Sequence, residues 1–490
     1  MDPRSTLRDA IFESPTDFSR RQVYGDLLQG EGDPRGAFIA AQCRLRDMDP
    51  LHAEYPALFA ESERLRADHA ASWLKPAMDL LGIEPEQQAA EALGGVREWT
   101  FVGGFLSHVS LELDAAIEHA AALAELEPID GIGIRLGEYI PDDQRVFPEV
   151  GSWRYLGVQP DGWFTDNSLA RALGWGLARV THLRLTKCSI GAAGCRMLAN
   201  LDTDLGDTFE DHVAPPPLPL GQLLSLDLMG CAIMDTGLEL LAKAQTLASL
   251  ETLDLTRNRL SGPASALLRA SPMFAKLRDL GLEGNNDMAE SLVELAGWSV
   301  LPQLRRLTLP QAMAPETLEA LFPQPSAALR QLELSNNKQI GPKTELVARC
   351  AQHFTHLDLG TAKVGDAGVQ SLVAAPSAAS LTSLELNGCS LSDKAVSALV
   401  DSDLQRLTRL DLSSNKLSNA ALAKLAAWPG LRHLTYLRLG NNRKLGQPGY
   451  QALAESPHFD PAQLDLGKVK DEGSRELLRE RFGARVSMRS

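Results

Sequence analysis

The sequence has few cysteines, and they are scattered. None of the six in the 490 residues forms a CxxC pair. This excludes a zinc ribbon or a dense disulfide framework, so we expect reduced thiols. The cysteines are Cys43, Cys188, Cys195, Cys231, Cys350 and Cys389.

Long apolar runs are also lacking. The N-terminus has no apolar stretch of the length that a secretory signal needs. No window approaches the roughly 18 uncharged apolar residues of a membrane span. We therefore expect a cytoplasmic protein that does not cross a membrane.

Positive charge is in deficit. The 48 Lys and Arg residues are outnumbered by 63 Asp and Glu residues, which gives a net charge of −15 and a pI near 5.2. A dedicated nucleic-acid binder needs clustered Lys and Arg, so this function is disfavoured. A basic protein is the expected partner.

Catalytic motifs are missing as well. The sequence has no P-loop, HExxH, nucleophile elbow or kinase signature. Residues 131–137 contain three glycines, but the third is one place too late for a dinucleotide loop, and the alternating isoleucines fit a strand. Residues 202–207 are rich in Asp, yet no Glu closes a calcium loop, which favours a solvated acidic loop. We expect no enzyme activity, no metal and no cofactor.

What the sequence does contain is a repeat. From residue 178 onward the phrase L-x-x-L-x-L-x-x-(N/C)-x-L returns, and from Leu228 its interval is 25 to 27 residues, with weaker copies before residue 178. This is the spacing of leucine-rich repeats, and we expect about 13 or 14 turns. The last leucines of successive phrases are Leu228, Leu255, Leu282, Leu309, Leu334, Leu359, Leu386, Leu412, Leu439 and Leu466.

Each turn is predicted to be a short strand followed by a helix. The period of two places the leucines on the buried face of the strand, and the second half has the three- and four-residue apolar spacing of a helix. An Asn or Cys after the strand is expected to satisfy buried backbone groups from turn to turn. These residues are Cys188, Cys231, Asn258, Asn285, Asn337, Cys389, Asn415 and Asn442.

The predicted fold is an α/β leucine-rich-repeat solenoid, a curved horseshoe with parallel strands on its concave face and helices on its convex face. Parallel strands stack more closely than helices, so the array must curve. We expect a small N-terminal helical module in residues 1–100, the array in 101–463 with an insertion loop at 201–219, and a C-terminal cap in 464–490. The last strand of the cap contains Leu464 and Leu466, and its charged helix turns Leu477, Leu478 and Phe482 inward.

The N-terminal segment resembles the bacterial repeat-companion domain, a short module that precedes leucine-rich repeats. The matching elements are Ala10-Ile11, Pro15-x-Asp17, Val23-Tyr24-x-Asp26-x-Leu28, Gly32-Asp33-Pro34-Arg35 and Phe38-Ile39-x-x-Gln42, followed by Trp99-x-Phe101-x-Gly103-Gly104-Phe105. The resemblance implies a bacterial protein but no biochemical activity. The repeats are similar to the ribonuclease-inhibitor class, which implies a protein-binding scaffold.

The candidate binding site is an acidic stripe on the concave face. Seven of the eleven residues between the last two leucines of each strand are acidic. The stripe would attract a basic protein, although Asp and Glu are also ordinary at a solvated position with Arg neighbours. The predicted partner-binding residues are Asp227, Asp254, Glu333, Asp358, Glu385, Asp411 and, as an aromatic anchor, Tyr436.

Two other functions stay open. The protein could regulate a partner enzyme, as a GTPase activator or an inhibitor, with Arg184 the most obvious donor on the concave face. Alternatively, the N-terminal module could have a role in assembly.

Overall fold

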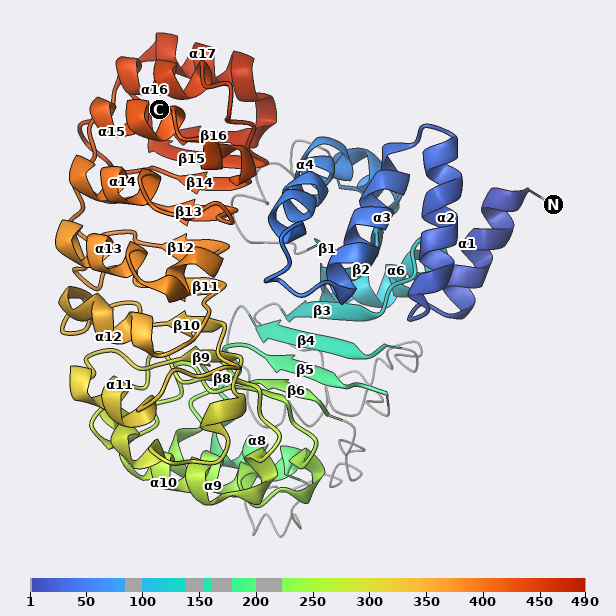
Figure 1. Cartoon of the computed structure of the whole chain (residues 1–490). Helices are drawn as coiled ribbons and strands as arrows, with labels where there is room; N and C mark the ends of the chain where they lie inside the picture. The colour runs from blue at the N-terminus through green and yellow to red at the C-terminus, as the bar shows by residue number, and fades with distance from the viewer. Residues whose placement is uncertain (1, 84–98, 137–152, 161–178, 200–222, 490) are drawn as a thin grey trace. The chain divides into compact units, whose positions relative to one another are not determined.

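The computed structural model describes residues 2–83, 99–136, 153–160, 179–199 and 223–489 (Figure 1). The chain divides into two compact units. The first comprises Met1–Ala40 and Ala71–Leu301, and the second comprises Ala41–Ala70 and Pro302–Ser490. The predicted insertion at 201–219 lies outside the described residues.

The N-terminal segment is helical, as the sequence predicts. Its helices begin at N-caps or turns; for example, the side chains of Asp2 and Asp17 accept hydrogen bonds from the backbone N–H groups of Arg4 and Ser19. The helices are α1 (Pro3–Glu13), α2 (Phe18–Gly30), α3 (Pro34–Asp47) and α4 (Tyr55–Leu80).

In the first unit, an antiparallel hairpin of β1 and β2 opens a sheet that continues with parallel strands to β8. The strands are β1 (Trp99–Val102), β2 (Phe105–Glu112), β3 (Gly131–Leu136), β4 (Tyr155–Pro160), β5 (His182–Leu185), β6 (Ser225–Asp227), β7 (Thr252–Asp254) and β8 (Asp279–Gly281). The helices between them are α6 (Leu113–Leu126), α8 (Gly191–Leu198), α9 (Met234–Leu241) and α10 (Pro263–Ala270). Short 3₁₀ turns replace the predicted helix after β8, at Asn286–Met288 and Ser291–Leu295.

The second unit repeats strand and helix more regularly, and its strands β9 to β16 are parallel (Figure 1). The strands are β9 (Arg306–Thr308), β10 (Gln331–Glu333), β11 (His356–Asp358), β12 (Ser383–Glu385), β13 (Arg409–Asp411), β14 (Tyr436–Arg438), β15 (Gln463–Lys468) and β16 (Val486–Arg489). The helices are α11 (Pro315–Leu321), α12 (Thr344–Arg349), α13 (Gly365–Val373), α14 (Asp393–Val400), α15 (Asn419–Ala426), α16 (Gln447–Ala454) and α17 (Glu472–Phe482).

The predicted ladder of Asn and Cys side chains is confirmed. Asn258 is fully buried; its Nδ2 donates to the carbonyl of Leu228 at 2.8 Å, and its Oδ1 accepts from the N–H of Cys231 at 3.0 Å. The Sγ of Cys389 donates to the carbonyl of Leu359 at 3.0 Å. Each ladder side chain therefore bonds the turn that precedes its own.

The residue immediately before each of these ladder positions has a positive φ, that is, a left-handed backbone conformation. Arg257, for example, has a φ of 57°, and Gly230 and Gly284 take the equivalent place in other turns. This conformation costs an L-residue about 1–2 kcal/mol, so the buried ladder bonds must offset it. The other left-handed residues before the ladder are Lys187, Asn336, Gly388, Ser414 and Asn441.

Two arginines fix the N-terminal helices to the hairpin within the first unit. Arg21 is 2% exposed and donates to the carbonyl oxygens of Val102 and Pro15. Arg35 forms a bidentate pair with Glu127, with both distances 2.8 Å. The planar guanidinium donates two parallel hydrogen bonds in a fixed geometry, so such a pair is specific in direction as well as in charge.

The C-terminal end differs from the prediction in two details. The strand at Leu464–Leu466 is not the last one, because β16 follows α17 and pairs with β15. Leu478 and Phe482 of α17 are buried as expected, whereas Leu477 is half-buried. The added strand covers the edge that β15 would otherwise expose.

Among the described residues, no helix combines the length and the apolar character that crossing a membrane requires. The same residues contain no group of three or more His, Cys, Asp or Glu side chains suited to a metal ion.

Candidate functional site

The strand face is the surface formed by the side chains that alternate with the buried leucines. In the second unit, Glu333, Asp358, Glu385 and Asp411 are direct register partners on β10 to β13. In the first unit, Asp227 and Asp254 are partners on β6 and β7. The structure thus brings together the acidic residues predicted within each unit.

The aspartates of this row have a structural role that the sequence analysis missed. Each accepts a hydrogen bond at its Oδ1 from the backbone N–H two residues later, at distances of 2.7 to 2.9 Å. In four of the five turns the strand ends at the aspartate and the chain turns, whereas β15 continues past its aspartate to Lys468. The aspartates are Asp227, Asp254, Asp358, Asp411 and Asp465.

Glutamates occupy the same row without such a bond to the chain. Glu333 accepts from the guanidinium of Arg306 at 2.9–3.0 Å. Burial raises the pKa of Glu385, and the neighbouring charge of Asp411 raises it further. Burial likewise raises the pKa of Asp227, although the N–H of Met229 opposes this shift. The row therefore carries partly buried negative charge.

Arginines interrupt the row and neutralise part of it. Arg438 lies 3.1 Å from Asp411 and 3.0 Å from Asp465. Arg184 lies 3.1 Å from Asp227 and donates to the hydroxyl of Thr186 at 3.0 Å. Asp411 is only 3% exposed, so it contributes little surface for a partner.

Tyr436, the predicted anchor, is half-buried on β14. The guanidinium carbon of Arg409 lies 4.3 Å from the centre of its ring. Burial raises the pKa of the Tyr436 phenol. The ring is thus a fixed apolar surface beside the carboxylates.

The sequence analysis missed a hollow of about 430 Å³ on the strand face of the first unit. Gly133 lines it, and a Cβ there would lie 2.3 Å from the hydroxyl of Ser110; a Cβ at Gly131, on the same strand, would lie 2.4 Å from the ring of His108. The rings of His108 and Tyr155 are 4.9 Å apart, and burial lowers the pKa values of His108 and His182. The sequence feature that could have revealed this hollow is a group of three glycines on the neighbouring strands β3 and β4, at positions 131, 133 and 157.

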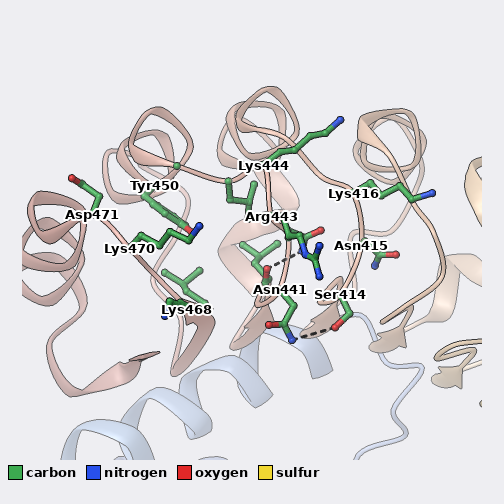
Figure 2. Close-up of a pocket in the computed structure, with 15 residues that line it drawn as sticks. Ser414, Asn415, Lys416, Asn441, Arg443, Lys444, Tyr450, Lys468, Lys470 and Asp471 are labelled. Carbon is green, nitrogen blue, oxygen red and sulfur yellow. Dashed lines mark hydrogen bonds between the residues drawn. The ribbon is translucent and has the colours of Figure 1, made fainter. Parts of the chain in front are cut away.

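A second hollow lies at the turns after β13 to β15, and Figure 2 shows its lining. It has a volume of about 1020 Å³ and is lined by five cationic side chains and one carboxylate. The cations are Lys416, Arg443, Lys444, Lys468 and Lys470. Their positive charge contrasts with the acidic row.

Six segments match the family model described as Leucine Rich repeat, at residues 180–199, 223–242, 350–373, 377–400, 404–426 and 430–454. No curated protein matches the chain. The solved structures that are similar to it include the following two. The complex of Rad7 and Elc1 in yeast has 18% identity and a TM-score of 0.42, with 66% of this chain and 78% of that chain covered. An internalin (inlF) of Listeria monocytogenes has 20% identity and a TM-score of 0.36, with 68% and 86% covered.

With these matches, the predicted fold class is confirmed as an α/β leucine-rich-repeat solenoid with a helical N-terminal region. The two solved structures are too distant to inform the binding surface.

Proposed function

We propose that this leucine-rich-repeat protein is a non-catalytic scaffold that binds a basic protein through its strand face. We further propose that it is a bacterial, cytoplasmic protein and that residues 1–100 form a repeat-companion module. The binding residues in this proposal are Asp227, Asp254, Glu333, Asp358, Glu385, Asp411 and Tyr436, with the nearly buried Asp411 adding charge rather than contact surface.

One observation carries the proposal: four acidic residues on the consecutive strands β10 to β13 are in register. Like charges directly opposite one another destabilise a sheet by roughly 0.2–1 kcal/mol per pair. Burial raises the pKa of Glu385, and the neighbouring charge of Asp411 adds to this shift. A basic partner would relieve the repulsion and would be steered to the surface by the same field.

Within the acidic row of the strand face, the two glutamates are the positions at which a substitution tests binding without disturbing the fold. The aspartates hold their own strand ends, so replacing them would disturb the fold. Glu333 and Glu385 lack that bond and are half-buried at the surface. A test of binding should therefore change the glutamates and leave the aspartates intact.

Regulation of a partner enzyme through Arg184 is not favoured. The guanidinium of Arg184 is engaged by Asp227 and Thr186 within the sheet. A catalytic arginine supplied to a partner would have to leave both contacts.

The test is affinity capture from native lysate with the full chain, followed by mass spectrometry. The test variant is Glu333→Lys/Glu385→Lys/Tyr436→Ala. The control variant is Glu319→Lys/Glu345→Lys, which makes the same charge change at exposed positions on α11 and α12. A basic protein retained by the wild type and the control but lost with the test variant supports the proposal. Equal retention by all three proteins contradicts it.

A further inference from the structure

The hollow at the turns after β13 to β15 gathers positive charge in a chain with a net charge of −15. All five of its cationic residues are exposed. None of the five has an ion pair with any residue that the structure describes. Three arginines of the strand face differ from them: Arg184, Arg306 and Arg438 are each paired with a carboxylate.

Three of the cations share one repeat position. Lys416 and Arg443 directly follow the ladder residues Asn415 and Asn442, and Lys470 comes 27 residues after Arg443, the same interval that separates Lys416 from Arg443. In Figure 2 the turns that carry these three residues lie side by side. The ladder holds those turns in place, since the Oδ1 of Asn442 accepts from the N–H of Leu417 at 3.1 Å. The ladder therefore fixes the backbone positions from which these cationic side chains extend.

The one carboxylate that lines the hollow, Asp471, forms hydrogen bonds with its own helix, α17. The Oδ2 of Asp471 accepts from the N–H of Ser474 at 2.7 Å and from its hydroxyl at 2.6 Å, and these bonds hold the pKa of Asp471 below its usual value. Asp471 caps α17 and does not pair with the surrounding lysines. The hollow also offers neutral polar groups, including Ser414 and Asn441, which are joined by a hydrogen bond of 3.3 Å.

We propose that this hollow binds a short acidic segment, rich in Asp and Glu, of a partner protein. Two steps between strands span roughly 10 Å, which is the length of about three residues of extended chain. A short run of carboxylates therefore matches the row Lys416, Arg443 and Lys470. A nucleic acid is a poorer fit, because its longer run of negative charge would be repelled by the rest of an acidic molecule.

The site is independent of the acidic row in the proposed function, since the two surfaces select partners of opposite charge. Each proposal can fail without the other: one is tested with changes at Glu333 and Glu385, and the other with changes at the cations of the hollow.

The experiment measures fluorescence anisotropy of a labelled hexapeptide of alternating Asp and Glu, titrated with the full chain at low salt. A hexapeptide of Asn and Gln serves as the neutral probe. The test variant is Lys416→Glu/Arg443→Glu/Lys470→Glu. The matched control is Lys276→Glu/Arg349→Glu/Lys394→Glu, which makes the same charge change at exposed positions elsewhere.

We expect the acidic peptide to bind the wild type and the control, and the test variant to bind at least 10-fold more weakly. The affinity should also fall as salt is raised. Three outcomes would overturn the proposal: no binding of the acidic peptide by the wild type, an equal loss in both variants, or tighter binding of a single-stranded oligonucleotide or an anionic phosphatidylserine vesicle than of the peptide. Circular dichroism of both variants checks that they are folded. If the test variant is unfolded, the single change Arg443→Gln, with a smaller expected loss, replaces it.

Discussion

The guanidinium carbon of Arg409 lies 4.3 Å from the centre of the Tyr436 ring, and the two residues are register partners on β13 and β14. Such a contact contributes about 0.5–1 kcal/mol at an exposed site. Tyr436→Phe should keep the midpoint of urea unfolding, and Tyr436→Ala should lower it. In a double-mutant cycle with Arg409→Ala, we expect a coupling free energy of about 0.5–1 kcal/mol. Additive effects would show that the ring and the guanidinium do not interact.

Replacing Asn258 should strongly destabilise the array. Asn258→Ala removes the partner of the buried Leu228 carbonyl and of the Cys231 N–H. Each unsatisfied buried group costs about 1–3 kcal/mol, so we expect a total loss of at least about 2 kcal/mol. Asn258→Cys keeps a donor for the carbonyl, as Cys231 and Cys389 do in their turns, and should lose less. Urea unfolding, followed by circular dichroism, measures the free energy of unfolding of both variants. An equal loss of stability in the two variants would contradict the prediction.

Glu385→Gln should stabilise the protein at pH 7. Burial and the charge of Asp411 raise the pKa of Glu385, so the folded state binds its proton more readily than the unfolded state does. The ionised side chain therefore weakens the fold at neutral pH, and removing one like-charge pair should add about 0.2–1 kcal/mol. The gain should vanish near pH 3, where the carboxyl is protonated in both states. Thermal unfolding at both pH values measures it, with Glu319→Gln as the control; a gain that persists at pH 3 would refute the electrostatic explanation.

His356 should make the protein less stable in acid. Burial lowers its pKa, as do the charges of Arg306 and Arg409, while Glu333 opposes the shift. The unfolded state therefore binds a proton at higher pH than the folded state does. The contribution of His356 to the free energy of unfolding should be constant above the ordinary histidine pKa of about 6.5. It should fall as the pH drops toward the lower pKa of the folded state, and then level off. His356→Gln should flatten this fall in urea unfolding between pH 7.5 and 5, whereas the exposed control His353→Gln should not.

The pair of Arg35 and Glu127 should anchor the N-terminal helices. The two side chains are only 18% and 12% exposed. Removing one partner of a buried pair typically costs about 3–5 kcal/mol, because the other charge is left without compensation. Arg35→Ala should therefore speed hydrogen exchange in α1 and α2 without affecting β10 to β15. The double variant Arg35→Ala/Glu127→Ala should be less damaged than the sum of the single variants.

Much of this fold was predictable from residue spacing, and the reasons are local. Alternation of leucines in the strands and the return of the leucine phrase every 25 to 27 residues from Leu228 onward determine the core, the turns and the register. Cys188, Cys231 and Cys389 could be assigned to the ladder because each stands where other turns have Asn. The row of acidic residues was also found, since it depends on the same register.

Contacts that depend on side-chain direction were harder to foresee. The bonds from Asp254 or Asp358 to the chain two residues later need the actual bend at the strand end. The cations at 416, 443 and 470 stand at equal intervals in the sequence, but their lack of ion pairs becomes apparent only in three dimensions. The hollow near His108 depends on missing side chains at glycines, which a search for chemical groups passes over.

The ladder also gives the array a direction in which it can unravel. Asn285 bonds the N–H of Asn258, and Asn258 in turn bonds the N–H of Cys231, so each turn is closed by the one that follows it. Loss of a turn from the C-terminal side therefore leaves a buried N–H and carbonyl of its neighbour open. Sheet bonds break in either case, but of the ladder itself, loss from the N-terminal side leaves open only the side chain of the next ladder residue, which loses its backbone partners. Under a pulling force, peeling from the C-terminal end of an array should thus spread readily from turn to turn, whereas peeling from the other end should meet turns that are already closed.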